Sequence, residues 1–75
     1  MDQAYLSRYK TLGLNIAYYR KKRGLTQEEL AEKAEIDRST ISKTEIAFAG
    51  TSLDLIFKIS DILQIEPYKL FIERE

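Results

Sequence analysis

Residues 25–45 read LTQEELAEKAEIDRSTISKTE, and this stretch decides the fold of the chain. Thr26 and Glu29 have the spacing of a capping box, in which each side chain bonds the backbone N–H of the other at the start of a helix. Asp37 is of the type that caps a helix and precedes a second short run of helical spacing. Two short helices joined by a turn of about three residues form a helix-turn-helix pair, which we expect over about residues 26–47.

The inner face of this pair is small and apolar. Ala31 leaves room for the two helices to cross at a steep angle, and Leu30 and Ala34 share its side of the first helix. Ile36 fills the turn, and Ile41 anchors the second helix. We therefore expect the helices of the pair to cross at Ala31.

Apolar residues at steps of three and four predict three further helices outside the pair. These helices cover about residues 5–23, about 53–63 and a last segment that begins at Pro67. Gly24 suits the left-handed conformation that ends the first helix, and Ser52 suits the cap of the helix that follows it. We expect Leu70 and Phe71 to close the last helix onto the core. The prediction is an all-α, compact five-helix domain.

Length and composition bound the class of protein. The chain has 75 residues, enough for one domain over 1–75 with an N-terminal extension at 1–9, and 44% of them are hydrophobic, enough for a core. It has no cysteine and no histidine, so we expect no disulfide, no metal site, no cofactor and no catalytic site. Its apolar runs are short, far below the about 20 residues of a membrane span. We therefore expect a cytoplasmic protein that makes no membrane contact.

Charge is divided between the two parts of the sequence, although the net charge is zero. Residues 1–25 carry six basic side chains and one acidic one, a net charge of +5. Residues 26–75 carry six basic and eleven acidic side chains, a net charge of −5. One interpretation is that the positive part faces a polyanion. The alternative is that these cations are only a solvated helix end, because charge alone does not identify a partner.

A pattern of residues at fixed spacing covers about residues 10–72. Its central part is Leu25-Thr26-Gln27-Glu28-Glu29-Leu30-Ala31, followed by Ile36-Asp37-Arg38-Ser39-Thr40-Ile41-Ser42-Lys43 and Glu45. It extends upstream to Leu12-Gly13, Ile16 and Arg20, and downstream through Ser52-Leu53 to Ile59, Leu63 and Leu70-Phe71. The pattern resembles the Cro/repressor (XRE-type) helix-turn-helix family. The resemblance implies a lambda-repressor-like fold and a transcriptional regulator that binds double-stranded DNA of defined sequence.

The resemblance also implies roles for individual residues. The outward face of the second helix of the pair would read bases in the major groove through Arg38, Ser39, Ser42 and Lys43. Backbone phosphates would be contacted by Thr26, Gln27, Arg20 and Thr40. Arg20 would also form an ion pair with Glu45 and so tie the first helix to the recognition helix.

We expect the protein to act as a homodimer. Few phosphate contacts are available to one copy, so useful affinity requires two copies on two half-sites. The expected dimer surface is formed by Tyr68, Phe71 and Ile72 near the C-terminus. The N-terminal extension, with Tyr5, Leu6 and Tyr9, is the other expected dimer surface.

Three departures from the family pattern leave a second interpretation open. Glu35 stands where the family has a glycine in the turn, and Thr44 stands where a larger aliphatic residue is usual. The loop at 46–51 has no basic residue and leaves Phe48 as an apolar group at the surface. The alternative is therefore a protein-interaction module of the same fold, such as an antitoxin, with a partner protein in place of DNA.

Overall fold

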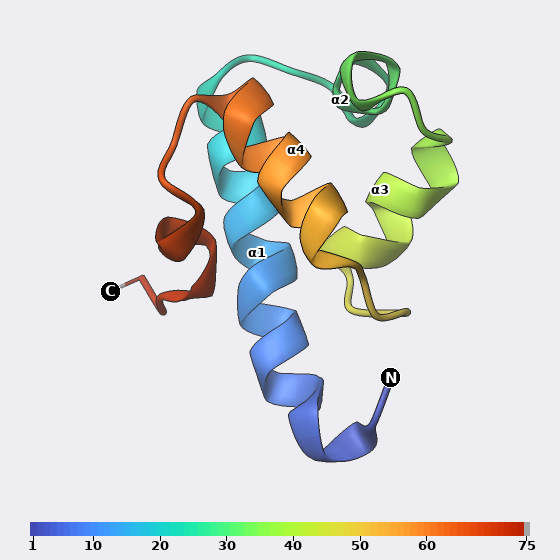
Figure 1. The fold of residues 1–75 in the computed structure, drawn as a ribbon, viewed down its shortest axis with the longest axis vertical. Coiled ribbons are helices and arrows are strands. Elements are labelled where there is room, and N and C mark those ends of the chain that lie inside the picture. Colours follow the sequence, from blue (N-terminus) through green and yellow to red (C-terminus); the bar gives the residue numbers. More distant parts are fainter. Residues whose placement is uncertain (75) are drawn as a thin grey trace.

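Four α-helices and two short 3-10 helices make up residues 1–74, the part of the chain described by the structure, a computed structural model (Figure 1). In chain order they are η1 (Gln3–Tyr5), α1 (Leu6–Lys22), α2 (Gln27–Ala34), α3 (Arg38–Glu45), α4 (Leu53–Leu63) and η2 (Pro67–Phe71). No strand occurs within residues 1–74, and the all-α prediction is confirmed. No helix in this part is both long and apolar enough to span a lipid bilayer.

The last segment differs from the predicted fifth α-helix. Pro67–Phe71 is a 3-10 helix, in which the backbone N–H of Lys69 donates to the carbonyl three residues earlier at 3.0 Å. Pro67 stands at the first position, where its missing N–H costs nothing, but a segment of five residues is too short to be stable as an α-helix without support from the rest of the fold. Leu70 is fully buried but Phe71 is half exposed, so the prediction that both close onto the core is right only for Leu70.

The helix-turn-helix pair is shorter than predicted at its C-terminal end. α3 ends at Glu45 because Ala47 takes a left-handed conformation, with φ 56°, which no α-helix continues. The turn between α2 and α3 is also left-handed, at Glu35 (φ 58°), the position where the family has glycine. The backbone N–H of Ile36 then donates to the carbonyl of Ala31 at 3.0 Å, which satisfies a carbonyl at the end of α2.

The predicted caps of α2 and α4 are present. The backbone N–H of Glu29 donates to the Thr26 hydroxyl at 3.0 Å, and the backbone N–H of Thr26 donates to the Glu29 carboxylate at 2.9 Å. The bonds from the backbone and side chain of Thr26 lower the pKa of Glu29, so the carboxylate half of this cap is present at neutral pH and weakens as pH falls through the lowered pKa. Ser52 accepts from the N–H of Leu55 at 3.1 Å, whereas Asp37 lies at the start of α3 without a capping bond.

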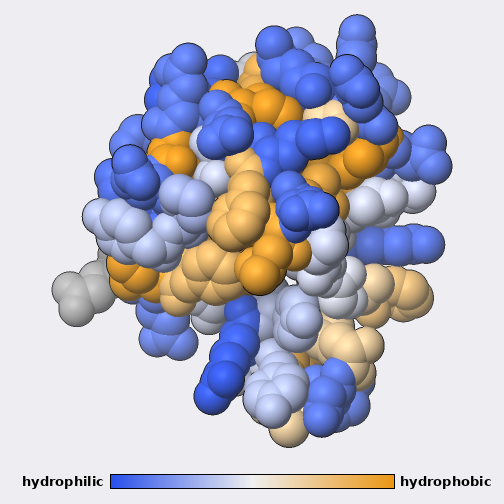
Figure 2. All heavy atoms as spheres, viewed as in Figure 1, coloured by the Kyte–Doolittle hydropathy of each residue, from blue (hydrophilic) through white to orange (hydrophobic). Residues whose placement is uncertain are grey.

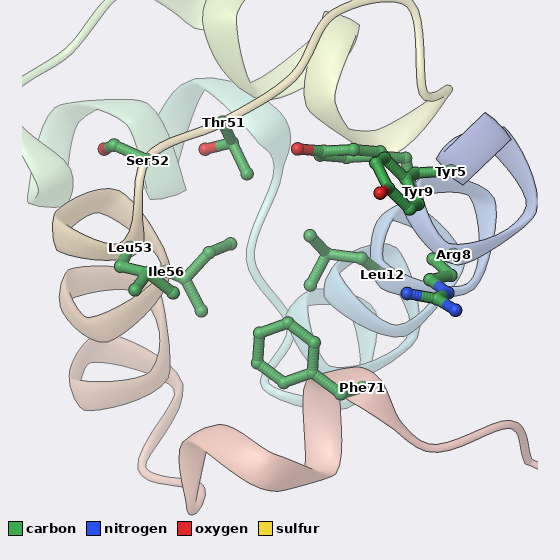
Figure 3. Close-up of a pocket in the computed structure, with 9 residues that line it drawn as sticks. All are labelled: Tyr5, Arg8, Tyr9, Leu12, Thr51, Ser52, Leu53, Ile56 and Phe71. Atoms are coloured by element: carbon green, nitrogen blue, oxygen red, sulfur yellow. The ribbon is translucent and has the colours of Figure 1, made fainter. Parts of the chain in front are cut away.

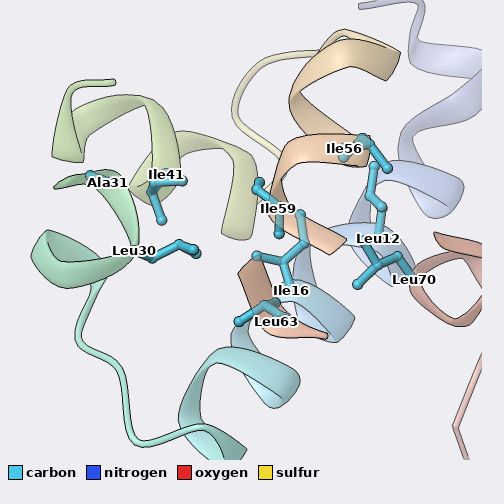
Figure 4. Close-up of a cluster of buried hydrophobic side chains, with 9 residues drawn as sticks. All are labelled: Leu12, Ile16, Leu30, Ala31, Ile41, Ile56, Ile59, Leu63 and Leu70. Atoms are coloured by element: carbon cyan, nitrogen blue, oxygen red, sulfur yellow. The ribbon is translucent and has the colours of Figure 1, made fainter. Parts of the chain in front are cut away.

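One core joins all four α-helices and η2. It consists of buried aliphatic side chains from each of them: Leu12, Ile16, Leu30, Ala31, Ile41, Ile56, Ile59, Leu63 and Leu70 (Figure 4). Ala31 lies beside Ile41 where α2 and α3 meet, as predicted for the crossing of the pair. α4 contributes three residues of this core, and in Figure 1 it crosses in front of α1.

The contact between α1 and α3 depends on Gly13. A Cβ atom built on Gly13 would lie 2.4 Å from the carbonyl oxygen of Glu45 and 2.6 Å from that of Thr44. Both atoms belong to the backbone, so no side-chain movement can relieve the overlap. α1 and the last turn of α3 therefore touch through their main chains, and only glycine permits this approach.

Replacing Gly13 with alanine should lower the free energy of unfolding by about 1–3 kcal/mol, the usual cost of overpacking. Inside an unobstructed helix, replacing glycine with alanine raises the free energy of unfolding by about 0.5–1 kcal/mol. The close contact at Gly13 therefore reverses the sign of the effect. Gly50→Ala is the matched control, because its Cβ would lie 3.5 Å from the Tyr9 hydroxyl, an ordinary contact. Urea unfolding followed by circular dichroism measures both; a Gly13→Ala protein as stable as wild type would contradict the close approach.

Candidate nucleic-acid interface

A buried ion pair joins α1 to the last residue of α3. The Nε of Arg20 donates to Glu45 Oε2 at 2.7 Å, and Nη2 donates to Oε1 at 3.1 Å, so guanidinium and carboxylate meet side by side. The side chains of Arg20 and Glu45 are 9% and 5% exposed. Nη1 of Arg20 donates to the carbonyl of Leu25 at 2.8 Å, directly before the N-cap residue of α2. The structure thus brings together the two residues that the resemblance pairs.

Gln27 adds α2 to this cluster. Its amide Nε2 donates to Glu45 Oε1 at 2.9 Å, so the carboxylate of Glu45 receives bonds from α1 and α2 at once. The side chain is half-buried, and the bond to Glu45 fixes its direction. Arg20 has every guanidinium nitrogen bonded within the protein and almost no exposed surface, so its place is structural. Arg20 also lines a surface depression together with Thr26 and Gln27, and the phosphate contact expected of it stays a prediction.

The outward face of α3 is polar and open to solvent. Arg38, Ser39 and Lys43 are exposed, and Ser42 is half-buried. The opposite side of α3 carries its buried residues, Ile41, Thr44 and Glu45. The four residues that the resemblance assigns to base reading therefore share one accessible helix face. The hydroxyl of Thr44 donates to the carbonyl of Thr40 at 2.8 Å, which satisfies this buried polar side chain within α3.

The starts of α2 and α3 come together at the surface. Thr26 and Gln27 line one shallow depression with Arg38, although the two helix starts are separated in sequence by the whole of α2. Glu28 lines the same depression and adds a negative charge beside the two polar residues. The free N–H groups at the start of a helix attract anions, so this arrangement offers α2 and Arg38 to the same strand of a polyanion. Thr40, the other expected phosphate contact, is exposed on α3.

The loop after α3 presents apolar rather than basic groups. Ile46 and Phe48 are the two most exposed large hydrophobic side chains among the described residues, and the buried Ala47 lies between them. The Nζ of Lys43 lies 5.8 Å from the centre of the Phe48 ring, so the loop adjoins the outward face of α3. A cation–π contact of this kind is weak at an exposed site.

A second polar cluster holds the C-terminal segment, and sequence reasoning missed it. Asn15 is buried and donates through Nδ2 to the carbonyls of Leu70 and Ile72, at 2.9 and 2.8 Å. Its Oδ1 accepts from Arg74 Nε at 2.8 Å, and the guanidinium of Arg74 lies 3.7 Å from the centre of the Tyr18 ring. In the sequence, Asn15 stands on the apolar face of α1, and this position is the one signal that its side chain is buried. The expected dimer residues Tyr68, Phe71 and Ile72 lie exposed on this segment.

Comparisons with known proteins agree with this geometry. The model of the family described as Helix-turn-helix (HTH_3) matches residues 16–70. An uncharacterised HTH-type transcriptional regulator of Methanocaldococcus jannaschii is 39% identical over 57 residues, which cover 76% of this chain and 86% of that protein. The restriction-modification controller protein C.AhdI of Aeromonas hydrophila superposes with a TM-score of 0.83 at 34% identity, covering 87% of this chain and 98% of that one.

A further similar structure is that of SinR, the master regulator for biofilm formation, solved in complex with DNA. It superposes with a TM-score of 0.77 at 32% identity and covers 81% of this chain and 98% of that one. The family model extends over both the helix-turn-helix pair and most of the core that supports it.

Removing the Glu45 side chain should lower the free energy of unfolding far more than removing an exposed carboxylate does. Glu45→Ala leaves the guanidinium of Arg20 buried without its counter-charge, and we expect a loss of about 3–5 kcal/mol in the free energy of unfolding. In a double-mutant cycle with Arg20→Ala, the coupling energy should be about 0.5–3 kcal/mol. Glu32→Ala, at an exposed position of α2, is the control and should change stability by about 0.5 kcal/mol or less. A coupling energy of zero by chemical unfolding would exclude an energetic pair.

Proposed function

This chain belongs to the helix-turn-helix family of transcriptional regulators, and from that premise we propose that it binds double-stranded DNA of defined sequence as a homodimer. The family is one of DNA-binding regulators and not of enzymes. In this proposal residues 1–75 act as one domain, α3 is the recognition helix, and two copies contact two half-sites of one operator about 34 Å apart.

The observation that supports the proposal is the exposed polar face of α3 on a helix held at its buried end. Arg38 and Lys43 carry the donors that bind O6 and N7 of guanine, and Ser39 and Ser42 bond several bases. The Arg20–Glu45 pair and the main-chain contact at Gly13 fix the end of α3 against α1. Base reading requires such fixed geometry, because a hydrogen bond to a base edge discriminates only over a narrow range of distance.

Phosphate contacts would come from the start of α2, from Thr40 and from Arg20, which lines one surface depression with Thr26 and Gln27. Thr26 and Gln27 lie beside Arg38 in one surface depression, so one strand of the duplex reaches all three. The bond from Gln27 to Glu45 uses one N–H of the amide and orients it, and the second N–H is the donor that a phosphate oxygen would accept from. A phosphate contact of this kind sets the register of the protein on DNA without reading sequence.

One observation, on the loop after α3, supports the alternative function of a protein-interaction module. Ile46 and Phe48 are exposed apolar groups where a phosphate-binding loop would carry cations. Such groups suit a partner protein better than a polyanion. If the chain is a protein-interaction module, it will show no preference for a selected duplex over a random one.

Mutating Arg38 and Gln27 should separate base reading from phosphate contact. Against a duplex selected from a random library, Arg38→Ala should cost about 1–3 kcal/mol and relax the preference at one base pair in each half-site. Gln27→Ala should weaken binding to all duplexes alike. Fluorescence anisotropy with the selected duplex and its single-base variants measures both effects.

Lys33→Ala is the matched control for charge, since Lys33 is an exposed cation of α2 outside the surface depression. It should leave sequence preference unchanged. An Arg38→Ala protein that keeps the full preference of wild type would overturn the assignment of α3 to base reading.

A further inference from the structure

An apolar groove of about 360 Å³ opens between α1 and α4 (Figure 3). Leu12 of α1 and Ile56 of α4 point into it from opposite sides, and the ring of Phe71 closes one end. Leu53, which is 62% exposed, forms the rim on the α4 side. Among the described residues that line the groove, Arg8 on α1 is the one charged side chain. The groove is therefore an apolar recess with a single positive charge at its border.

A protruding aromatic side chain lies next to this groove on α4. Phe57 is 48% exposed and follows Leu53 by four residues, so the two share one face of the helix. Figure 2 shows apolar side chains gathered over α4 in the middle of this face of the molecule. Asp54 and Asp61, both exposed, come three residues before and four residues after Phe57 and so flank it. The ring is bordered by these two negative charges, and the neighbouring Lys58 directs its Nζ to the carbonyl of Ala34 at 3.2 Å.

We propose that a second copy of this chain docks on this face with two-fold symmetry, so that Phe57 of each copy enters the groove of the other. A two-fold interface pairs one surface with itself, and it needs a projection and a recess side by side on that surface. Phe57 and the groove meet this requirement, because Leu53 adjoins both.

The charges and the area of the face favour a second copy over an unrelated occupant. The groove carries Arg8, and the projection carries Asp54 and Asp61, so docking brings opposite charges together on both sides of the symmetry axis. A standard interface buries about 800 Å² per partner. The accessible surface of this chain is 5119 Å², so a dimer interface of this size needs roughly one-sixth of it.

This inference rests on the proposed function, which requires a dimer, and it names the surface that the dimer uses. Phe71 belongs to the dimer surface expected from the sequence, and here it closes the groove. The bonds of Asn15 to the carbonyls of Leu70 and Ile72 hold Phe71 from both sides along the chain. None of the described residues that line the groove belongs to α3, so this mode of docking leaves the recognition face free.

Sedimentation equilibrium of the full chain tests the proposal directly. Phe57→Glu places a charge in the apolar groove of the partner and removes the ring. A hot-spot side chain changes a dissociation constant by about 30-fold, and the two symmetric sites together give roughly 1000-fold. Leu14→Glu is the matched control, since Leu14 is 63% exposed on α1 but does not line the groove, and it should leave the dimer constant unchanged.

A charge exchange tests the pairing independently of the aromatic ring. Arg8→Asp should weaken the dimer by facing the carboxylates of the partner. Adding Asp54→Arg or Asp61→Arg to that variant should restore it, because one of the two carboxylates meets Arg8. Failure of both rescues, together with an unchanged dimer constant for Phe57→Glu, overturns the proposed surface.

Binding to a duplex with one half-site separates failure of this inference from failure of the proposed function. Phe57→Glu should keep the half-site affinity of wild type and lose only the tighter binding to two half-sites. If wild type dimerises and Phe57→Glu dimerises equally well, this surface is wrong and the proposed function stands. If wild type stays monomeric even on a duplex with two half-sites, both are wrong.

Discussion

The position of α3 depends on Glu45, whose backbone and side chain are both engaged by α1. Its carbonyl lies against Gly13, where the two helices touch main chain to main chain. Its carboxylate receives two bonds from Arg20 and one from Gln27. A buried ion pair adds little net stability compared with a pair of apolar side chains in the same place. Removing one partner, however, leaves the other charge buried without compensation. The main effect of the cluster is therefore to select one arrangement of α1, α2 and α3. Its contribution to the free energy of unfolding is less important.

The fixed position of α3 explains how a chain with zero net charge can bind DNA. The chain presents its cations at Arg38 and Lys43 on one fixed helix face, and the loop beyond α3 adds none. Few phosphate contacts mean weak nonspecific binding and a shallow dependence on salt. Affinity must then come from correctly placed base contacts and from a second copy, and the exposed face of α4 with its adjoining groove fits that need.

Local signals in the sequence were sufficient for the helix order, the capping box at Thr26 and Glu29, the cap at Ser52 and the place of Ala31. Each depends on residues close together in the chain. The left-handed conformation of Glu35 was not predicted, because glutamate carries no local preference for it. The family resemblance supplied the Arg20–Glu45 pair. Contacts across long separations were not predictable, such as Gly13 against α3 and the bonds of Arg23 to the end of α4. The 3-10 form of Pro67–Phe71 was missed because Asn15 and the core, not local propensity, hold that segment.

The central claim is that the outward face of α3 lies against DNA while α1 and α4 stay clear of it. Titrating the isotope-labelled chain with a selected duplex and following its backbone amide signals by NMR tests this most directly. We expect the largest shifts at Arg38, Ser39, Ser42 and Lys43 and at the start of α2, with Ile59 and Leu63 unchanged. Shifts concentrated on α4, with those four amides unmoved, would contradict it.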